Sequence, residues 1–145
     1  MKALLQRVRY ARVLVDGDCV GEIESGMLVL LGVERDDEPA MVERMAERLL
    51  DYRLFADGEG RMNASLRDTG GGLLLVSQFT LAADTRKGLR PGFSTAAPPP
   101  EAERLYNALL AALRARHAPV ASGRFAAHMQ VELLNDGPVT FLLEM

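Results

Sequence analysis

The sequence predicts a mixed α/β fold in one domain that spans residues 1–145. Aliphatic runs and alternating apolar segments are numerous, whereas only two stretches carry an apolar stripe at helical spacing. Turn signals at residues 16–18 and 135–138 lie between segments of strand character, and no linker or repeat divides the chain. We therefore expect curved, barrel-like and largely antiparallel sheets with two main helices packed on one side, in a three-layer α/β/β arrangement.

The first half of the chain reads as strands followed by a helix. Ala11, Val13 and Val15 alternate with other residues, which is typical of a strand that buries one face. The almost wholly aliphatic run 27–33 predicts a central strand, and acidic residues with Pro39 signal the first turn of a helix. The predicted elements are strands at 2–8, 11–15, 19–23 and 27–33, a helix that begins at residues 36–39 and ends near residue 51, and a short strand at 53–55.

The second half begins with three glycines, which release the backbone into the buried run Leu73 to Val76. Three consecutive prolines, 98–100, stiffen the chain before a second helix with its own apolar stripe. Met129, Val131 and Leu133 alternate with polar residues. The predicted elements are a strand at 73–76, a helix at 101–116, a strand at 126–134, a turn at 135–138 and a final strand at 139–143.

Composition excludes several classes of function. Apolar residues make up 48% and charged residues 26%, which is ordinary globular usage and argues against disorder. The single Cys19 forms no internal disulfide, and without a Cys/His cluster we expect neither a metal site nor a cofactor. No signal peptide or membrane span is evident, which favours a cytoplasmic protein. The net charge of −3 argues against wrapping DNA or other nucleic acid, but it allows a local basic patch.

The stretch after the strand 73–76 is the main candidate for chemistry. It reads Ser77-Gln78-Phe79-Thr80, although a central strand has no packing need for three polar side chains in four positions. Either it forms the mouth of a site, or the strand surfaces there into a polar turn. Ser77 or Thr80 could act as a nucleophile, but no Lys, Asp or Glu in the motif could take the proton. The alternative is that backbone N–H groups and hydroxyls hold a carbonyl and its developing oxyanion.

Other residues have a structural and a functional interpretation. His117 at the end of a helix suits capping, and His128 on a polar strand face suits a surface position better than catalysis. Gly137-Pro138 is by default a trans turn, but a cis bond would direct two rigid carbonyls one way and make a stereochemical gate. Two clusters of cations are either solvated or grip one end of an RNA: Arg7, Arg9 and Arg12, and Arg86, Lys87 and Arg90.

Two motifs carry a resemblance to a known family. Residues 76–81 (Val-Ser-Gln-Phe-Thr-Leu) and 135–140 (Asn-Asp-Gly-Pro-Val-Thr) resemble the paired signatures of the D-aminoacyl-tRNA deacylases. The resemblance runs almost end to end, through residues 6–8, 30–33, 62–63 and 123–127. It implies a homodimeric, metal-independent esterase that removes D-amino acids, and glycine mischarged on alanine tRNA, from the 3′ end of tRNA.

The resemblance also implies roles for single residues. The catalytic pocket would consist of Ser77, Gln78, Phe79 and Thr80, with Thr80 the debated nucleophile; we favour main-chain groups and the terminal ribose hydroxyl of the tRNA. Gly137 and Pro138 would enter from the other subunit and exclude L-amino acids, so the dimer interface completes the site. Phe125 and Met129 would line the pocket for the terminal adenosine.

One residue departs from the expected family pattern, since we expect an acidic residue where this chain has His128. We expect Arg86, Lys87 and Arg90 to contact the acceptor stem. Two other functions stay open: a module that binds a nucleotide or an aminoacyl-tRNA end without turnover, and an amidase with a Thr nucleophile.

Overall fold

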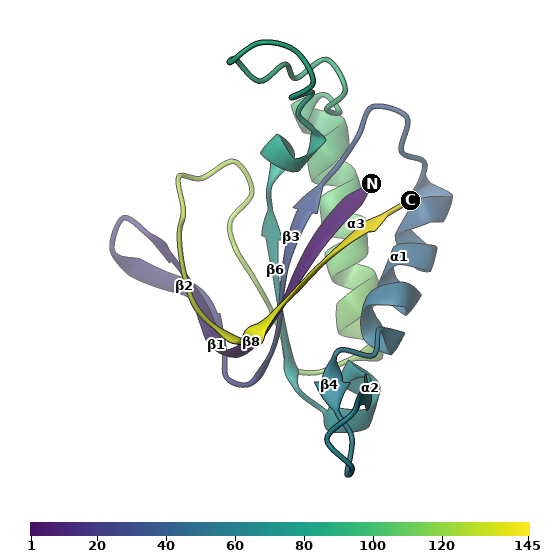
Figure 1. Ribbon diagram of the computed structural model, residues 1–145. Helices are drawn as coiled ribbons and strands as arrows, with labels where there is room; N and C mark the ends of the chain where they lie inside the picture. The colour runs from purple at the N-terminus through teal and green to yellow at the C-terminus, as the bar shows by residue number, and fades with distance from the viewer.

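The sheet is organised around its long first strand in the computed structural model, which describes residues 1–145 (Figure 1). β1 pairs antiparallel with β3 along its first half, with β2 along its second half, and with β8 along both. β6 pairs parallel with β3, and β7 pairs parallel with β6. The mixed, largely antiparallel sheet is confirmed. Its strands are β1 (Lys2–Val15), β2 (Asp18–Ile23), β3 (Gly26–Gly32), β6 (Gly72–Ser77), β7 (Val120–Ser122) and β8 (Gln130–Glu144).

Two helices, α1 (Pro39–Asp51) and α3 (Pro99–Arg116), lie side by side on one face of this sheet (Figure 1). Along β3 and β6, alternate side chains such as Val29 and Leu75 join a buried core with both helices. Their neighbours, such as Leu28 and Leu74, point the other way into a second core against the curled halves of β1 and β2. Two cores on opposite faces of one sheet make the predicted three layers, α/β/β.

Three sequence predictions about the strands were wrong. β1 is one continuous strand, because β8 pairs with both of its halves and register shifts absorb the irregularity near Val8. Residues 126–129 form a turn in which Ala126 has a positive φ of 61°, so the last strand begins only at Gln130. Residues 135–138 do not reverse the chain; they bulge out of β8, which runs antiparallel to β1 before and after them.

The connections between the main elements hold the shorter ones. Between α1 and β6 lie β4 (Phe55–Ala56), β5 (Met62–Ala64) and the one-turn helix α2 (Leu66–Thr69). Ser65 and Asp68 form a reciprocal capping box at the start of α2, a signal that our sequence prediction missed. None of the helices combines the length and the apolar character that crossing a membrane requires.

Candidate active site

The polar motif lies where the central strand β6 ends. β6 stops at Ser77, and Phe79–Ala82 form a 3-10 turn, η1. The N–H group of Gln78 donates to the carbonyl of Leu31 at 2.7 Å, which fixes the start of η1 against the end of β3. Gly32 permits this approach, because a Cβ at that position would lie 2.8 Å from the Cβ of Leu81. The motif is therefore held rigidly at the rim of the core.

The backbone N–H groups of Phe79 and Thr80, at the start of η1, have no hydrogen-bond acceptor within the protein. A 3-10 turn leaves its first N–H groups free, and neither Phe79 nor Thr80 donates a backbone hydrogen bond elsewhere. The hydroxyl of Thr80 accepts a bond from Nε2 of Gln78 at 2.5 Å, and no acidic or basic side chain bonds to it. This arrangement can bind a carbonyl oxygen through main-chain N–H groups, but it lacks the base that an activated hydroxyl needs.

A cavity of about 490 Å³ lies beside the turn. Twelve of its 16 lining residues are hydrophobic, and its size is typical of a small-molecule site. It brings together Ser77, Gln78 and Phe79 with Phe125 and Met129, the residues predicted for the catalytic segment and the adenosine pocket. Thr80 does not line it. A larger hollow of about 750 Å³ between β2 and residues 70–72 is mostly polar; it includes Arg12 but none of the residues predicted for the catalytic segment, the adenosine pocket or the chiral gate.

The inner wall of this cavity includes Tyr106, which our sequence prediction missed. Its hydroxyl donates to the carbonyl of Leu75 at 3.0 Å, and its ring lies 5.7 Å from the ring of Phe125. Burial raises the pKa of Tyr106 to about 12, so the phenol stays neutral. The available signal was an aromatic hydroxyl within the apolar stripe of α3, since a buried Tyr needs a polar partner.

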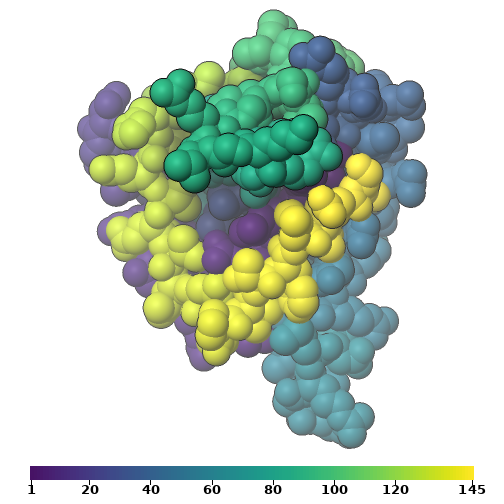
Figure 2. Space-filling view, turned by 45° about the horizontal axis from the view of Figure 1, so that its top comes forward, coloured from purple at the N-terminus to yellow at the C-terminus, as the bar shows by residue number.

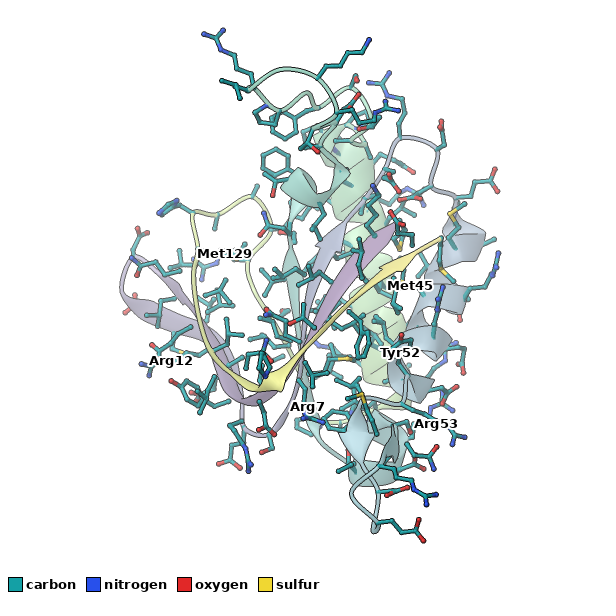
Figure 3. The ribbon with its side chains drawn as sticks, viewed as in Figure 1. Arg7, Arg12, Met45, Tyr52, Arg53 and Met129 are labelled. Carbon is teal, nitrogen blue, oxygen red and sulfur yellow. The ribbon has the colours of Figure 1, made fainter.

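The outer wall is the loop that leads into β8, on which Figure 3 labels Met129. A Cβ at Gly123 would lie 2.8 Å from Sδ of Met129, so the glycine makes room for this side chain. The N–H group of Arg124 donates to the same sulfur at 3.4 Å. His128 lies on this loop rather than on a strand, with its exposed side chain at the edge of the cavity. The loop conformation therefore sets the position of Met129.

Gly137 and Pro138 lie in the bulge of β8, away from the cavity of their own chain. Their peptide bond is cis, and both residues are exposed. Asn135 closes the bulge, because its Oδ1 accepts the N–H of Val139 at 3.0 Å and its Nδ2 donates to Oγ1 of Thr140 at 2.9 Å. The φ of Gly137 is +137°, a conformation that favours glycine.

Arg7 supports the bulge from β1, and Figure 3 shows it beside the bend of β8. Its Nε donates to the carbonyl of Asp136 at 3.0 Å, and its Nη1 donates to the carbonyl of Leu54 at 3.0 Å. Arg9 and Arg12 also pair with β8, through Asp136 at 3.3 Å and Glu132 at 2.8 Å. This first cluster of cations therefore stabilises β8 rather than standing free.

His117 occupies the end of α3, as predicted. Its N–H group donates to the carbonyl of Leu113 at 2.9 Å, and its Nε2 lies 2.7 Å from the carbonyl oxygen of Gly71. The residue thus ties the helix end to the start of β6, remote from the cavity.

Comparison with known proteins gives one consistent answer. The model of the family described as D-Tyr-tRNA(Tyr) deacylase matches residues 4–144. The D-aminoacyl-tRNA deacylase of Stutzerimonas stutzeri (strain A1501) is 64% identical over 99% of both chains. That of Azotobacter vinelandii (strain DJ / ATCC BAA-1303) is 65% identical over the same shares.

A solved structure named c-Myc DNA Unwinding Element Binding Protein has the same fold, with a TM-score of 0.95 and 41% identity. The match covers 100% of this chain and 99% of that one. The family model and the full-length relatives agree with the two sequence motifs that lie in η1 and in the bulge of β8. The chain therefore belongs to the D-Tyr-tRNA(Tyr) deacylase family.

Proposed function

We propose that this protein hydrolyses the ester bond of D-aminoacyl-tRNA, releases the D-amino acid and free tRNA, and rejects L-aminoacyl-tRNA. Membership of a deacylase family supports the reaction class. The observation that carries the proposal is the pair of free N–H groups, of Phe79 and Thr80, next to an apolar cavity that is large enough for a nucleoside.

The free N–H groups would act on the carbonyl of the ester. As water attacks the carbonyl carbon, negative charge develops on the oxygen, and one or both donors stabilise it. The carbon–oxygen bond to the ribose then breaks, and the ribose oxygen leaves with a proton. Since the hydroxyl of Thr80 bonds only to the side chain of Gln78, we assign proton transfer to water and the neighbouring ribose hydroxyl of the tRNA. Ser77, Gln78, Phe79 and Thr80 hold the reacting groups in place.

The apolar cavity would bind the terminal adenosine. Phe125 and Met129 offer a flat ring and a polarisable sulfur, which suit the faces of a base. Tyr106 packs against Phe125 from inside and fixes the orientation of that ring. The few polar groups at the turn would then meet the ester at one end of the cavity.

Gly137 and Pro138 would select the hand of the amino acid. They are exposed and line no part of the cavity in their own chain, so they can reach a cavity only from a second copy. We therefore propose a homodimer whose interface completes each site. Leu134 and Leu142 of β8 are about half exposed, at 52% and 50%, and offer apolar surface for this contact.

A gate of main-chain atoms rejects a side chain on one face of the α-carbon. Glycine carries no side chain there, so glycine mischarged on alanine tRNA is included among the proposed substrates. An enzyme that acts on aminoacyl-tRNA during translation works in the cytoplasm.

A deacylation assay with D- and L-tyrosyl-tRNA tests the proposal. Hydrolysis of the D-ester only supports it, whereas binding of both without release would favour a non-catalytic module. The 41% identical structure is named as a binding protein, so the assay must distinguish hydrolysis from binding without turnover. Hydrolysis of an N-acyl amide substrate, but not of the ester, would favour an amidase instead.

A further inference from the structure

Two aromatic rings are exposed at the mouth of the cavity. Phe79 is 60% exposed and Phe93 is 41% exposed, and their ring centroids lie 5.1 Å apart at an angle of 46°. Phe79 lines the cavity, whereas Phe93 lies outside it. The pair therefore continues the apolar surface of the site outward, and neither burial nor the reaction at η1 accounts for the exposure of Phe93.

A basic loop, residues 84–92, precedes Phe93. Two backbone bonds close it, from Asp84 N to Gly92 O at 2.8 Å and from Gly92 N to Asp84 O at 3.0 Å. It projects from the molecule near the start of α3 (Figure 1), and Figure 2 shows it in teal above a hollow. Phe93 lies at the foot of this loop, so the cations and the aromatic pair are close along the chain.

The three cations of this loop are not equivalent. Arg86 forms two bonds to Asp84, Nε to Oδ1 and Nη2 to Oδ2, each 2.9 Å long. These bonds hold the pKa of Asp84 well below its usual range, so the pair stays ionised and its charges cancel. Lys87 and Arg90 are exposed and form no ion pair. The free positive charge of the loop therefore comes from Lys87 and Arg90.

We infer that Phe79 and Phe93 form a stacking platform for the unpaired nucleotides that precede the terminal adenosine, while Lys87 and Arg90 bind their phosphates. This inference rests on the proposed function, because it assumes that the adenosine occupies the cavity. The 3′ end of tRNA is single-stranded, and proteins bind such strands by combining aromatic faces with cations. A strand that leaves the cavity past Phe79 meets Phe93 next, and the two free cations oppose its charge.

The test compares two substrates, D-tyrosyl-adenosine and D-tyrosyl-CCA trinucleotide. Wild-type protein hydrolyses both, with a higher kcat/KM for the trinucleotide. The ratio of the two kcat/KM values falls about tenfold in Phe93→Ala, because the platform touches only the longer substrate. Phe93→Tyr keeps the wild-type ratio and Phe93→Leu, which fills space without an aromatic face, loses it. Melting temperatures confirm that each variant is folded.

The charge component is tested by salt dependence. For the trinucleotide, Lys87→Ala and Arg90→Ala each flatten the slope of log(kcat/KM) against log(salt) by about 0.7. Arg44→Ala is the matched control, since Arg44 is exposed on α1, forms no ion pair, and belongs to a helix that lines no part of the cavity. Its slope equals that of the wild type.

Three results would overturn the inference. One is an equal ratio of kcat/KM values in the wild type and Phe93→Ala. Another is a fall of the same size in kcat/KM for both substrates in Phe93→Ala. A third is dissociation of a dimer in Phe93→Ala, which would show that the ring forms a contact between subunits. If wild-type protein hydrolyses neither D-ester, the proposed function itself fails, so the two failures are distinguishable.

Discussion

Thr80 has the hydroxyl of a nucleophile without the neighbours that would activate it. Its only side-chain partner is the amide of Gln78, and an amide cannot take a proton. The structure of the turn thus agrees with the missing base in the sequence motif, and it makes the main-chain donors the simpler explanation of the motif.

Replacing Thr80 by Ala distinguishes a nucleophilic Thr80 from one that only positions Gln78. We expect kcat to fall about tenfold or less, because one hydrogen bond that positions Gln78 is lost. Single-turnover rates with D-tyrosyl-tRNA give the value. A loss of several orders of magnitude, together with a covalent D-tyrosyl-protein adduct in the wild type, would identify Thr80 as the nucleophile.

Tyr106 makes a prediction about pH. Its folded pKa of about 12 lies above the ordinary value of 10.0, so folding favours the neutral phenol. Its contribution to the free energy of unfolding is complete below pH 10 and is lost as pH rises towards 12. Tyr106→Phe should cost about 0.5–1.5 kcal/mol at pH 7, since the carbonyl of Leu75 keeps the N–H of Gly123 at 2.9 Å.

Urea denaturation between pH 8 and pH 12 checks this prediction. The free energies of unfolding of the wild type and Tyr106→Phe should converge above about pH 10, and Tyr106→Phe should become the more stable protein as pH approaches 12. A constant difference across the range would show that the phenol is not protected by burial.

At the level of elements, the bulge in β8 is held by side chains at both of its ends. Asn135 bonds to Val139 and Thr140, and Arg7 bonds to the carbonyl of Asp136. A gate made of backbone depends on this support, because a shift of about 1 Å at a reacting centre can change a rate by two orders of magnitude.

Asn135→Ala removes the closing bonds of the bulge. We expect the ratio of kcat/KM for D- over L-tyrosyl-tRNA to fall about 10- to 100-fold, with kcat for the D-ester less affected. Gln6→Ala is the matched control, because Gln6 also donates to Oγ1 of Thr140, at 3.3 Å, but does not contact the bulge backbone. If the D- over L-tyrosyl-tRNA ratio of kcat/KM is the same in Asn135→Ala and Gln6→Ala, the bulge does not determine selectivity.

At the level of the whole molecule, the proposed site needs two copies of the chain. Leu142→Glu places a charge on half-exposed apolar surface of β8, and we expect monomers that no longer deacylate D-tyrosyl-tRNA. Met62→Glu is the control, since Met62 is similarly exposed at 46% but belongs to β5 rather than to β8. Analytical ultracentrifugation gives the oligomeric state of each variant, and the deacylation rate with D-tyrosyl-tRNA gives its activity. A fully active monomer would contradict the shared site.

The sequence predicted those parts of the molecule that depend on local pattern. The aliphatic runs of β3 and β6 and the apolar stripes of α1 and α3 each specify burial, and these elements lie close to their predicted bounds. The errors lie where strand pairing or tertiary contacts, rather than the local apolar pattern, determine the backbone conformation. The alternation at Met129 suggested a strand, but the side chain instead fills the space above Gly123 at the cavity wall.

The candidate site was predictable only in part for a similar reason. The motif at Ser77 to Thr80 was visible because polar residues follow a core strand. Tyr106 was not, because only the fold brings α3 beside the end of β6. The free cations of the basic loop could not be separated from Arg86 without the contact to Asp84.

The central claim is that main-chain groups bind the reacting ester while the backbone of a partner subunit selects its hand. A crystal structure with a non-hydrolysable D-aminoacyl-adenosine analogue tests it most directly. We predict that the carbonyl oxygen of the analogue lies about 2.7–3.1 Å from the N–H nitrogen of Phe79 or Thr80, with Gly137 and Pro138 from the second copy facing the α-carbon. An analogue whose carbonyl carbon lies against Oγ1 of Thr80, with no Gly137-Pro138 near it, would contradict the account.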